Sequence, residues 1–332
     1  ALLVDGLQAE REQNITIDVA YRYFSTSVRS FVVADTPGHE QYTRNMATAA
    51  STAEAAILLV DASKGLLQQT RRHAYIASLL GVRHVVLAVN KMDRAGFDEQ
   101  VFNTISADFS QFAEQLSFAT LACVPICAKD GDNISVSSQR MRWYRGQALL
   151  ELLEGIDLEI TVAARPMRFP VQWVNRPDEN FRGFSGTIAS GVVRTGDKIA
   201  VAGSGHTTSV KNIVTAAGNL EEAVAGQAVT ITLADEIAVT RGDVLCPRDE
   251  RPQVADQFAA HVIWMSEDHM LPGRGYLMKI GTAMTPATIT EIKHRVDVNT
   301  LDKHAAKFLE LNDVAYCNLS TAIPVAFEPY CD

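Results

Sequence analysis

The sequence predicts an α/β domain with a parallel sheet and flanking helices, followed by two small antiparallel β-barrel domains. Three observations support this fold class. The chain has 332 residues, which is too many for one average hydrophobic core. Its first half alternates continuous apolar runs with helix-like segments, a rhythm typical of a parallel sheet. Its second half consists of short β-like runs separated by Gly, Asp and Asn.

Three apolar runs are expected to form strands of the parallel sheet. They are SFVVAD, AAILLVD and HVVLAVN, and their Val, Leu and Ile content predicts strands buried on both faces. Between the second and third runs, QQTRRHAYIASLLG has apolar residues at helical spacing and a Gly where a helix would end. The runs end in Asp35, Asp61 and Asn90. Because ligands bind beyond the carboxyl ends of strands in open α/β sheets, we expect a site at this edge.

The character of the sequence changes near residues 165–170. We therefore place the first domain at residues 1–164, the first barrel at 165–251 and the second barrel at 252–332. In the first barrel, TIASGVVRTGDKIAV has the pattern of antiparallel strands joined by tight turns. In the second barrel, the β-like runs are AAHVIWM, GYLMKIG, ATITEIKHRVDV and VAYCNLSTAIPVAFEP.

The composition argues against several classes of function. A net charge of −9 gives no general attraction to nucleic acid or to an anionic membrane, so we expect neither as a partner. No apolar stretch is long enough to span a bilayer. The five cysteines are odd in number and form no C-x-x-C pair, which favours reduced, packed thiols in a cytoplasmic protein over a metal site or disulfides.

Two short motifs at the expected sheet edge together predict a guanine-nucleotide site. D-x-x-G at residues 35–38 follows the first apolar run, and Asn-Lys-Met-Asp at residues 90–93 follows the third. D-x-x-G alone is too loose to be informative, and the second motif is only moderately specific. Their order, and the strand–helix unit between them, make a chance pairing improbable.

The second motif has residue types that suit guanine. Guanine offers two adjacent donors, the ring N–H and the exocyclic amino group, and the carboxylate of Asp93 can accept both. Adenine has an acceptor at that ring nitrogen and would leave Asp93 unpaired. Asn90 and the stem of Lys91 would brace the loop and cover the base. Residues 127–129, after another apolar run, would direct backbone N–H groups to the guanine oxygen. The candidate base-binding residues are Asn90, Lys91, Met92, Asp93, Cys127, Ala128 and Lys129.

The first motif has residue types that suit a terminal phosphate. Asp35 would hold a water bound to Mg²⁺, and the amide of Gly38 would contact the γ-phosphate, where a side chain would crowd it. His39 follows at the place from which an attacking water is oriented, so it is the candidate catalytic residue. Upstream, the hydroxyl of Thr16 would ligate Mg²⁺ while the triphosphate is bound. The candidate phosphate-side residues are Asp35, Thr36, Pro37, Gly38 and His39, with Thr16 and Asp35 as metal ligands.

Several stretches carry a resemblance to a known family. EREQNITID, DTPGHEQYTRNM, QTRRH and NKMD resemble the translation-factor class of GTPases, the relatives of elongation factor Tu. Within that class, the chain is most similar to the GTPase (large) subunits of sulfate adenylyltransferase. The stretches that narrow the resemblance are TIDVAYRYF, HEQYTRNMAT and MRFPVQWVNRPDENFRGFSGTIASG. The resemblance covers nearly the whole chain. Cys127 stands where the family has Ser.

The resemblance implies a P-loop GTPase domain. In this family the phosphate-binding loop lies N-terminal to the segment that begins here with ALLVDGLQAEREQ, so we expect residues 1–164 to lack it. The end of the chain, FEPYCD, is likewise expected to stop short of the closing strands of the family.

The resemblance also implies a function in sulfate assimilation. The chain would be the regulatory GTPase subunit of a heteromeric nucleotidyltransferase, with GTP or GDP and Mg²⁺ as cofactors. Its partner would be the small catalytic subunit of sulfate adenylyltransferase, in a heterodimer or a higher assembly. That subunit makes adenosine 5′-phosphosulfate and pyrophosphate from ATP and sulfate, and GTP hydrolysis on this chain would drive the uphill reaction.

Two alternatives remain open at this point. One is an elongation-factor-like GTPase that delivers aminoacyl-tRNA. It would need a basic and aromatic surface on the barrels, and residues 166–332 contain no dense Lys/Arg cluster. The other is a scaffold that no longer hydrolyses GTP. Replacement of His39 by Ala should abolish GTP turnover if the chain is an enzyme, and should change nothing if it is a scaffold.

Overall fold

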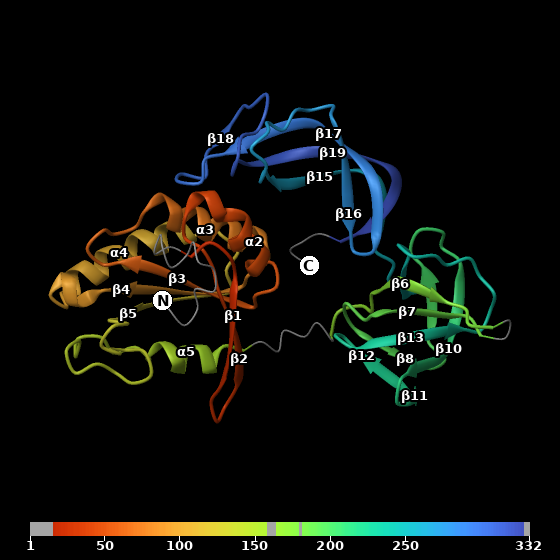
Figure 1. Cartoon of the computed structure of the whole chain (residues 1–332), viewed down its shortest axis with the longest axis horizontal. Coiled ribbons are helices and arrows are strands. Elements are labelled where there is room, and N and C mark those ends of the chain that lie inside the picture. Colours follow the sequence, from red (N-terminus) through yellow and green to blue (C-terminus); the bar gives the residue numbers. More distant parts are fainter. Residues whose placement is uncertain (1–15, 158–163, 179–180, 329–332) are drawn as a thin grey trace. The chain divides into compact units, whose positions relative to one another are not determined.

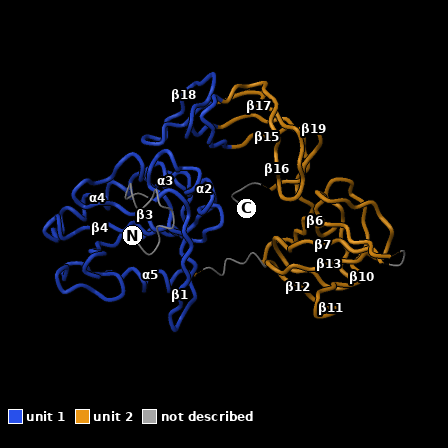
Figure 2. The backbone as a smooth tube through the Cα atoms, in the orientation of Figure 1, with its two compact units in different colours: residues 1–156, 261–269, 294–315 blue, residues 157–260, 270–293, 316–332 orange. Residues whose placement is uncertain are grey.

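The structure, a computed structural model, describes residues 16–157, 164–178 and 181–328. The chain divides into two compact units (Figure 2). Unit 1 comprises residues 1–156, 261–269 and 294–315, and unit 2 comprises residues 157–260, 270–293 and 316–332. The division into domains at residues 164/165 and 251/252 stays a prediction, and the start of the first expected domain lies outside the described residues.

Unit 1 contains a parallel three-stranded sheet with the strand order β3-β4-β5, which confirms the predicted parallel sheet (Figure 1). Its strands are β3 (Ala55–Asp61), β4 (His84–Asn90) and β5 (Thr120–Pro125). The helices between and after them are α3 (Gln68–Leu79), the short 3₁₀ helix η2 (Met92–Ala95), α4 (Glu99–Ala113) and α5 (Leu149–Gly155). The expected helix is α3, and Gly81 closes its end at a φ of +81°.

Of the three described strands of this sheet, β4 is the one buried on both faces along nearly its whole length. On one face, Val85, Leu87 and Val89 pack into a core with the apolar side chains of α3 and α4. On the other face, Val86 and Ala88 pack against the leucines of α5. This two-sided burial explains why the run HVVLAVN is continuously apolar.

The prediction that all three runs are buried on both faces is wrong for β3. Alternate residues of β3 enter the core with α3, but Ile57 and Leu59, which point to the other face, are 39% and 63% exposed. The physical reason is that α5 does not extend over β3. Its leucines pack against β4 and the segment that ends β5. Within the described residues, no helix covers that face of β3.

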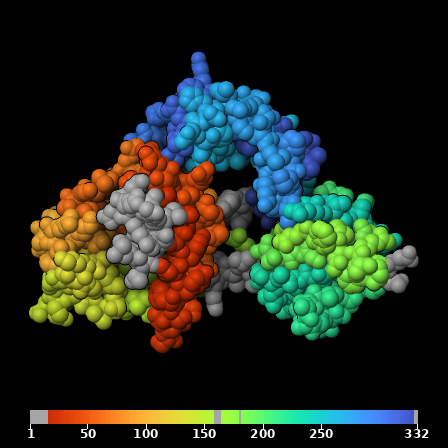
Figure 3. Space-filling model, viewed as in Figure 1, coloured from red at the N-terminus to blue at the C-terminus, as the bar shows by residue number. Residues whose placement is uncertain are grey.

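The first apolar run also differs from the prediction. It forms β2 (Ser30–Asp35), which pairs antiparallel with β1 (Ala20–Ser25), and Phe24 stacks on Phe31 across this hairpin. Val32 is 62% exposed, because the hairpin contributes few side chains to the cores of unit 1. In Figure 3 the hairpin lies in the red part of the surface. After it come the 3₁₀ helix η1 (Glu40–Tyr42) and helix α2 (Thr43–Ala50).

Unit 2 contains a closed antiparallel barrel, which confirms the first expected barrel. In its seven-stranded sheet the order is β11-β10-β13-β7-β6-β14-β9, and a further pairing of β9 with β10 closes it. The strands are β6 (Phe169–Asn175), β7 (Gly183–Thr187), β9 (Lys198–Val201), β10 (Thr207–Thr215), β11 (Gly218–Leu220), β13 (Ala228–Leu233) and β14 (Val244–Pro247). Two short strands, β8 (Val192–Arg194) and β12 (Glu222–Val224), form a separate pair. The core of the barrel includes Phe169, Phe184 and Ile231.

The stretch TIASGVVRTGDKIAV is partly as predicted. It does form strands joined by a tight turn, in which the Asp197 carboxylate accepts the Arg194 N–H at 2.7 Å and Gly196 has a φ of +91°. The strands on either side of the turn, β8 and β9, do not pair with each other, since β8 pairs with β12 and β9 with β10 and β14.

The predicted β-like runs of residues 252–332 are strands of another sheet. Its order is β15-β19-β17-β16, with β18 beside β17, and β16 and β17 pair antiparallel. The strands are β15 (Gln253–Ile263), β16 (Gly275–Ile280), β17 (Ala283–Val296), β18 (Lys303–His304) and β19 (Val314–Phe327). Among the described residues, the cysteines are free thiols and no helix is long and apolar enough to cross a membrane.

Helix α3 contains a histidine that makes unit 1 sensitive to acid. Burial, together with the neighbouring positive charge of Arg72, lowers the pKa of His73 from 6.5 to about 4. Its Nε2 is buried without a hydrogen-bond partner in the described residues, so protonation would bury an unpaired charge. The unfolded chain takes up this proton below pH 6.5 and the folded chain resists it down to about pH 4.

We therefore expect the free energy of unfolding to be highest above pH 6.5, where His73 is neutral in both the folded and the unfolded chain. It should fall by up to about 3 kcal/mol between pH 6.5 and pH 4. The measurement is urea unfolding as a function of pH. His73→Gln should flatten the loss over this window, while His206→Gln, at an exposed position of unit 2, should leave it unchanged. Parallel pH curves for the wild type and His73→Gln would contradict the prediction.

Candidate functional site

The carboxyl ends of β3 and β4 meet at one edge of the parallel sheet. Asp61, the last residue of β3, is in register with Asn90, the last residue of β4. The Nζ of Lys91 lies 2.7 Å from Oδ2 of Asp61. Hydrogen bonds from Lys91 and Ser63 hold the pKa of Asp61 well below its usual range, so this carboxylate stays ionised. Asp61 thus fixes the side chain of Lys91 beside the predicted site.

The Asn90–Asp93 turn is joined to the loop after β5. Lys91 has a left-handed φ of +61°, and the Asn90 side-chain oxygen accepts its N–H at 2.7 Å. The same oxygen accepts the N–H of Ala128 at 3.0 Å. Met92 is fully buried and its N–H donates to the carbonyl of Ile126. The predicted bracing role of Asn90 therefore has a visible basis, since one carboxamide holds both loops.

A pocket of about 300 Å³ opens between these two loops. Its lining residues are Asn90, Lys91, Asp93, Arg94, Cys127 and Lys129. The volume is at the lower end of the ~300–1,000 Å³ typical of small-molecule sites. The structure thus brings together most of the base-binding residues predicted from the sequence. The other two, Met92 and Ala128, are not among the lining residues, and their amides join the two loops.

Cys127 contacts the candidate base-reading carboxylate. Its Sγ lies 3.4 Å from Oδ1 of Asp93, and the thiol is fully buried. Burial raises the pKa of the Cys127 thiol, and the nearby Asp93 carboxylate raises it further. The thiol therefore keeps its proton and donates to Asp93, which orients the carboxylate towards the pocket.

The expectation for the backbone of residues 127–129 needs a correction. The N–H of Cys127 donates to the carbonyl of Asp132, and the N–H of Ala128 is taken by Asn90. Both amides are engaged because they close the turn and connect it to β4. Among the described residues, this leaves the amide of Lys129 as the backbone donor of this segment without a protein acceptor.

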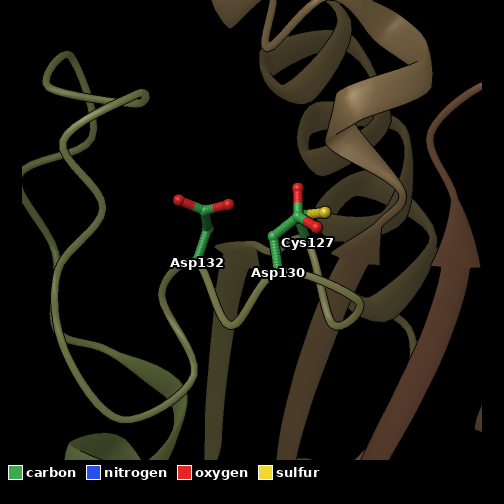
Figure 4. A group of neighbouring side chains, drawn as sticks. All are labelled: Cys127, Asp130 and Asp132. Carbon is green, nitrogen blue, oxygen red and sulfur yellow. The ribbon is translucent and has the colours of Figure 1, made fainter.

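A group of possible metal ligands lies in the same loop. Cys127, Asp130 and Asp132 each offer a ligand atom, and these atoms lie within 4.8 Å of one another (Figure 4). However, the Arg140 guanidinium forms ion pairs with both carboxylates and lowers the pKa of Asp130. The guanidinium carbon of Arg140 also lies 4.5 Å from the ring centroid of Phe97, in the loop after the Asn90–Asp93 turn. The group is therefore a brace for the pocket walls, in which one guanidinium pairs with two carboxylates.

The phosphate-side motif follows β2 in unit 1. Asp35 is the last residue of β2 and is in register with Ala20. Pro37 is buried, whereas Gly38 and His39 are exposed. A Cβ added to Gly38 would meet no heavy atom within 4 Å in the described residues, so protein packing gives no reason for a glycine there. The contact of Gly38 with a phosphate stays a prediction.

The segment after His39 is anchored by residues far away in the sequence. The Glu40 carboxylate forms an ion pair of 2.5 Å with Arg72 of α3, whose side chain is nearly buried. The carbonyl of Glu40 accepts from the side chains of Thr43, at 2.8 Å, and Asn312, at 2.9 Å. These contacts hold the start of η1 in place and leave His39 exposed at its N-terminal end.

Thr16 lies at the start of the described residues, next to α2. The side-chain amide of Asn45 in α2 donates to the carbonyl of Ile17 at 2.7 Å. The segment of Thr16 is therefore tied to the helix that follows the Asp35–His39 motif. Neither Thr16 nor the Asp35–His39 motif lines the pocket between the loops, so the structure shows two groups of candidate residues within unit 1.

Sequence reasoning missed three residues that hold the site. In the sequence, Asp61 is marked only as the end of a strand, and Arg72 only as part of a family-like stretch. Arg140 gave no local signal, because it lies far from every motif in the sequence. Burial and ion pairing reveal their roles in the structure.

Three family models match the chain. The elongation factor Tu GTP binding domain matches residues 1–162, elongation factor Tu domain 2 matches residues 184–246, and the GTP-eEF1A C-terminal domain-like model matches residues 257–332.

Curated relatives match the whole chain or nearly all of it. The chain is 54% identical over 332 residues to sulfate adenylyltransferase subunit 1 of Aeromonas salmonicida and covers 70% of that protein. It is 55% identical to the bifunctional enzyme NodQ of a Rhizobium species and 56% identical to the bifunctional enzyme CysN/CysC of Xylella fastidiosa. It covers 51% and 53% of these two proteins, so it spans about half the length of the bifunctional relatives.

Proposed function

Because the chain belongs to the sulfate adenylyltransferase subunit 1 family of elongation factor Tu-like GTPases, we propose that unit 1 binds and hydrolyses GTP. One observation carries the proposal. The pocket of about 300 Å³ at the carboxyl end of β4 combines the Asp93 carboxylate with a braced Asn90 and the amide of Lys129. This donor and acceptor set matches guanine.

Each polar group of the pocket has a role in base recognition. The Asp93 carboxylate accepts the ring N–H and the exocyclic amino group of guanine as a bidentate pair. The amide of Lys129 donates to the guanine oxygen. The stem of Lys91, fixed by its ion pair with Asp61, covers the face of the base. Adenine fails here because it has no ring donor for Asp93 and no oxygen for the amide.

On the phosphate side, the residues of the Asp35–His39 motif would contact the γ-phosphate and the attacking water. The amide of Gly38 donates to the γ-phosphate, and His39 orients the water. The carboxylate of Asp35 and the hydroxyl of Thr16 are oxygen donors of the kind that Mg²⁺ prefers, so they fit this ion. When bound, Mg²⁺ would neutralise charge on the phosphates. Loss of the γ-phosphate releases Gly38 and Thr16, and the link from Asn45 to Ile17 carries this change to α2.

We further propose that GTP hydrolysis on this chain drives the formation of adenosine 5′-phosphosulfate and pyrophosphate from ATP and sulfate. The printed names of its relatives, subunit 1 of sulfate adenylyltransferase among them, support this role and a partner subunit. ATP and sulfate would bind on that catalytic partner, and no residue of this chain is assigned to adenylyl transfer. We place the protein in the cytoplasm, which the free thiols of the described residues support.

The test of the coupling uses the intact polypeptide together with its small catalytic subunit. With ATP and sulfate present, GTP should raise the yield of adenosine 5′-phosphosulfate above its equilibrium yield, because only hydrolysis can drive the uphill reaction. A non-hydrolysable GTP analogue should not raise the yield. The coupling proposal fails if the yield is the same with GTP, with the analogue and with neither.

A further inference from the structure

A second pocket, the barrel pocket, lies in unit 2 on the closed barrel. Its volume is about 220 Å³. The β6–β7 connection contributes Arg176, Phe181 and Arg182, strand β10 contributes Lys211 and Asn212, and β13 contributes Thr232 (strands in Figure 1). None of these residues has a role in the GTP site proposed above.

The floor of the barrel pocket is a row of residues across three strands. Thr232 of β13 is in register with Asn212 of β10 on one side and with Gly183 of β7 on the other. A Cβ at Gly183 would come within 2.8 Å of the Phe181 ring, so this glycine allows the ring to lie against the sheet. The Phe181 ring therefore lies against the sheet beside this row of residues.

Thr232 carries an unexplained polar atom. Its side chain is 7% exposed, and its Oγ1 is buried with no hydrogen-bond partner in the described residues. A buried hydroxyl without a partner is unfavourable and rare in folded proteins. Thr232 lines the barrel pocket, so a bound ligand supplies the missing partner if the side chain rotates to turn Oγ1, which solvent does not reach here, towards the pocket.

Three cationic side chains line the same pocket. Arg176, Arg182 and Lys211 have no carboxylate partner among the described residues, unlike the ion-paired arginines at positions 168 and 194. The guanidinium of Arg182 lies 5.3 Å from the ring centroid of Phe184, which holds it in place. The pairing of β10 with β13 shifts register between Val210 and Asn212, so a bulge sets the direction of Lys211.

The carboxylates of the barrel pocket do not cancel these charges. Asp235 and Glu236 are exposed and lie at its rim, and Asp235 already accepts the Thr208 hydroxyl at 2.8 Å. Among the described lining residues, three cations stand against these two carboxylates, a net charge of +1. Cations without carboxylate partners and a hydroxyl donor suit a tetrahedral oxyanion, because each of its oxygens accepts hydrogen bonds.

We propose that the barrel pocket binds the sulfate or phosphate group of a small anionic ligand. Arg176, Arg182 and Lys211 donate charge-assisted hydrogen bonds to its oxygens, and the Thr232 hydroxyl donates one more. The volume of about 220 Å³ is below the ~300–1,000 Å³ of sites for drug-sized ligands, so the pocket encloses the oxyanion and leaves a larger attached group outside it. This site goes beyond the GTP site and does not depend on it.

The experiment measures binding of inorganic sulfate, inorganic phosphate and adenosine 5′-monophosphate to the full chain by calorimetry. The test variant is the double change Arg182→Gln and Lys211→Gln, and the matched control is Lys198→Gln, an exposed lysine of the same barrel outside the pocket. We expect the test variant to bind sulfate and phosphate about tenfold more weakly or worse, and the control to bind as the wild type does. Equal affinities in the wild type and the test variant would overturn the proposal.

Thr232→Val provides a second measurement that does not depend on the charged residues. It should unfold at the same temperature as the wild type or a higher one, because an unpaired buried hydroxyl is removed. It should also bind sulfate and phosphate several-fold more weakly. A Thr232→Val variant that binds oxyanions as the wild type does would contradict the assigned role of the hydroxyl.

The three ligands distinguish the sources of the oxyanion. If the mononucleotide binds no better than inorganic phosphate, the oxyanion itself is the ligand. If it binds more tightly, and the double variant loses that binding, the oxyanion belongs to a nucleotide. GTP binding by unit 1, measured in the same variants, should not change, so the failure of one proposal can be told from the failure of the other.

Discussion

Replacement of Asp93 by Asn is expected to weaken GTP binding about 10³-fold and to shift base preference towards xanthine. The Asp93 carboxylate lines the pocket and accepts from the Cys127 thiol, so its remaining oxygen lone pairs are directed to the base. An Asn side chain keeps one acceptor and turns the other into a donor, which opposes the amino group of guanine. Xanthine has a carbonyl in place of that amino group, so the same donor becomes favourable.

The measurement is the Kd of GTP, of xanthosine 5′-triphosphate and of ATP for the intact polypeptide and for Asp93→Asn. Asp98→Asn is the matched control, because Asp98 follows in the same loop but caps α4 through its Oδ1 and lies outside the pocket. This control should bind all three nucleotides as the wild type does. An Asp93→Asn variant that binds GTP within a few-fold of the wild type would show that this pocket does not hold the base.

The parts of the site that could be predicted from the sequence are those with short-range signals. A continuous apolar run, the polar residue at its end and the short motif that follows all lie within a few positions of one another. The end of β4 at Asn90 and the turn to Asp93 were therefore predicted at the right place. The parallel arrangement followed from the strand–helix–strand rhythm.

The parts that could not be predicted depend on distant residues. Asn312 contacts the carbonyl of Glu40 across 272 positions, and Arg29 donates to the carbonyl of Leu153 across 124. No periodicity carries such information. The exposure of Leu59 has the same origin, because it depends on which strands α5 covers and not on the residues of β3 themselves. Likewise, the amide of Ala128 is unavailable to a ligand only because Asn90 folds back to it.

Replacement of His39 by Ala is expected to lower GTP turnover about 10²–10⁴-fold and to leave GTP affinity nearly unchanged. His39 is exposed, its side chain does not cap η1, and the contacts that hold the segment belong to Glu40, Arg72 and Asn312. Its removal therefore costs little stability and leaves the neighbouring backbone in place. What is lost is the group that orients the attacking water, which acts in the transition state and not in the bound ground state.

The measurement is single-turnover hydrolysis of GTP by the intact polypeptide, alone and with the small catalytic subunit, next to the Kd of GTP. His206→Ala, at an exposed position of unit 2, is the matched control and should hydrolyse GTP at the rate of the wild type. A fall in turnover with unchanged affinity assigns His39 to the chemical step, and the same variant should then no longer raise the yield of adenosine 5′-phosphosulfate. Equal turnover in His39→Ala and the wild type would remove His39 from the mechanism. Slow turnover in both would instead favour the scaffold, because a chain that binds GTP without hydrolysing it has no free energy to transfer to the adenylyl reaction.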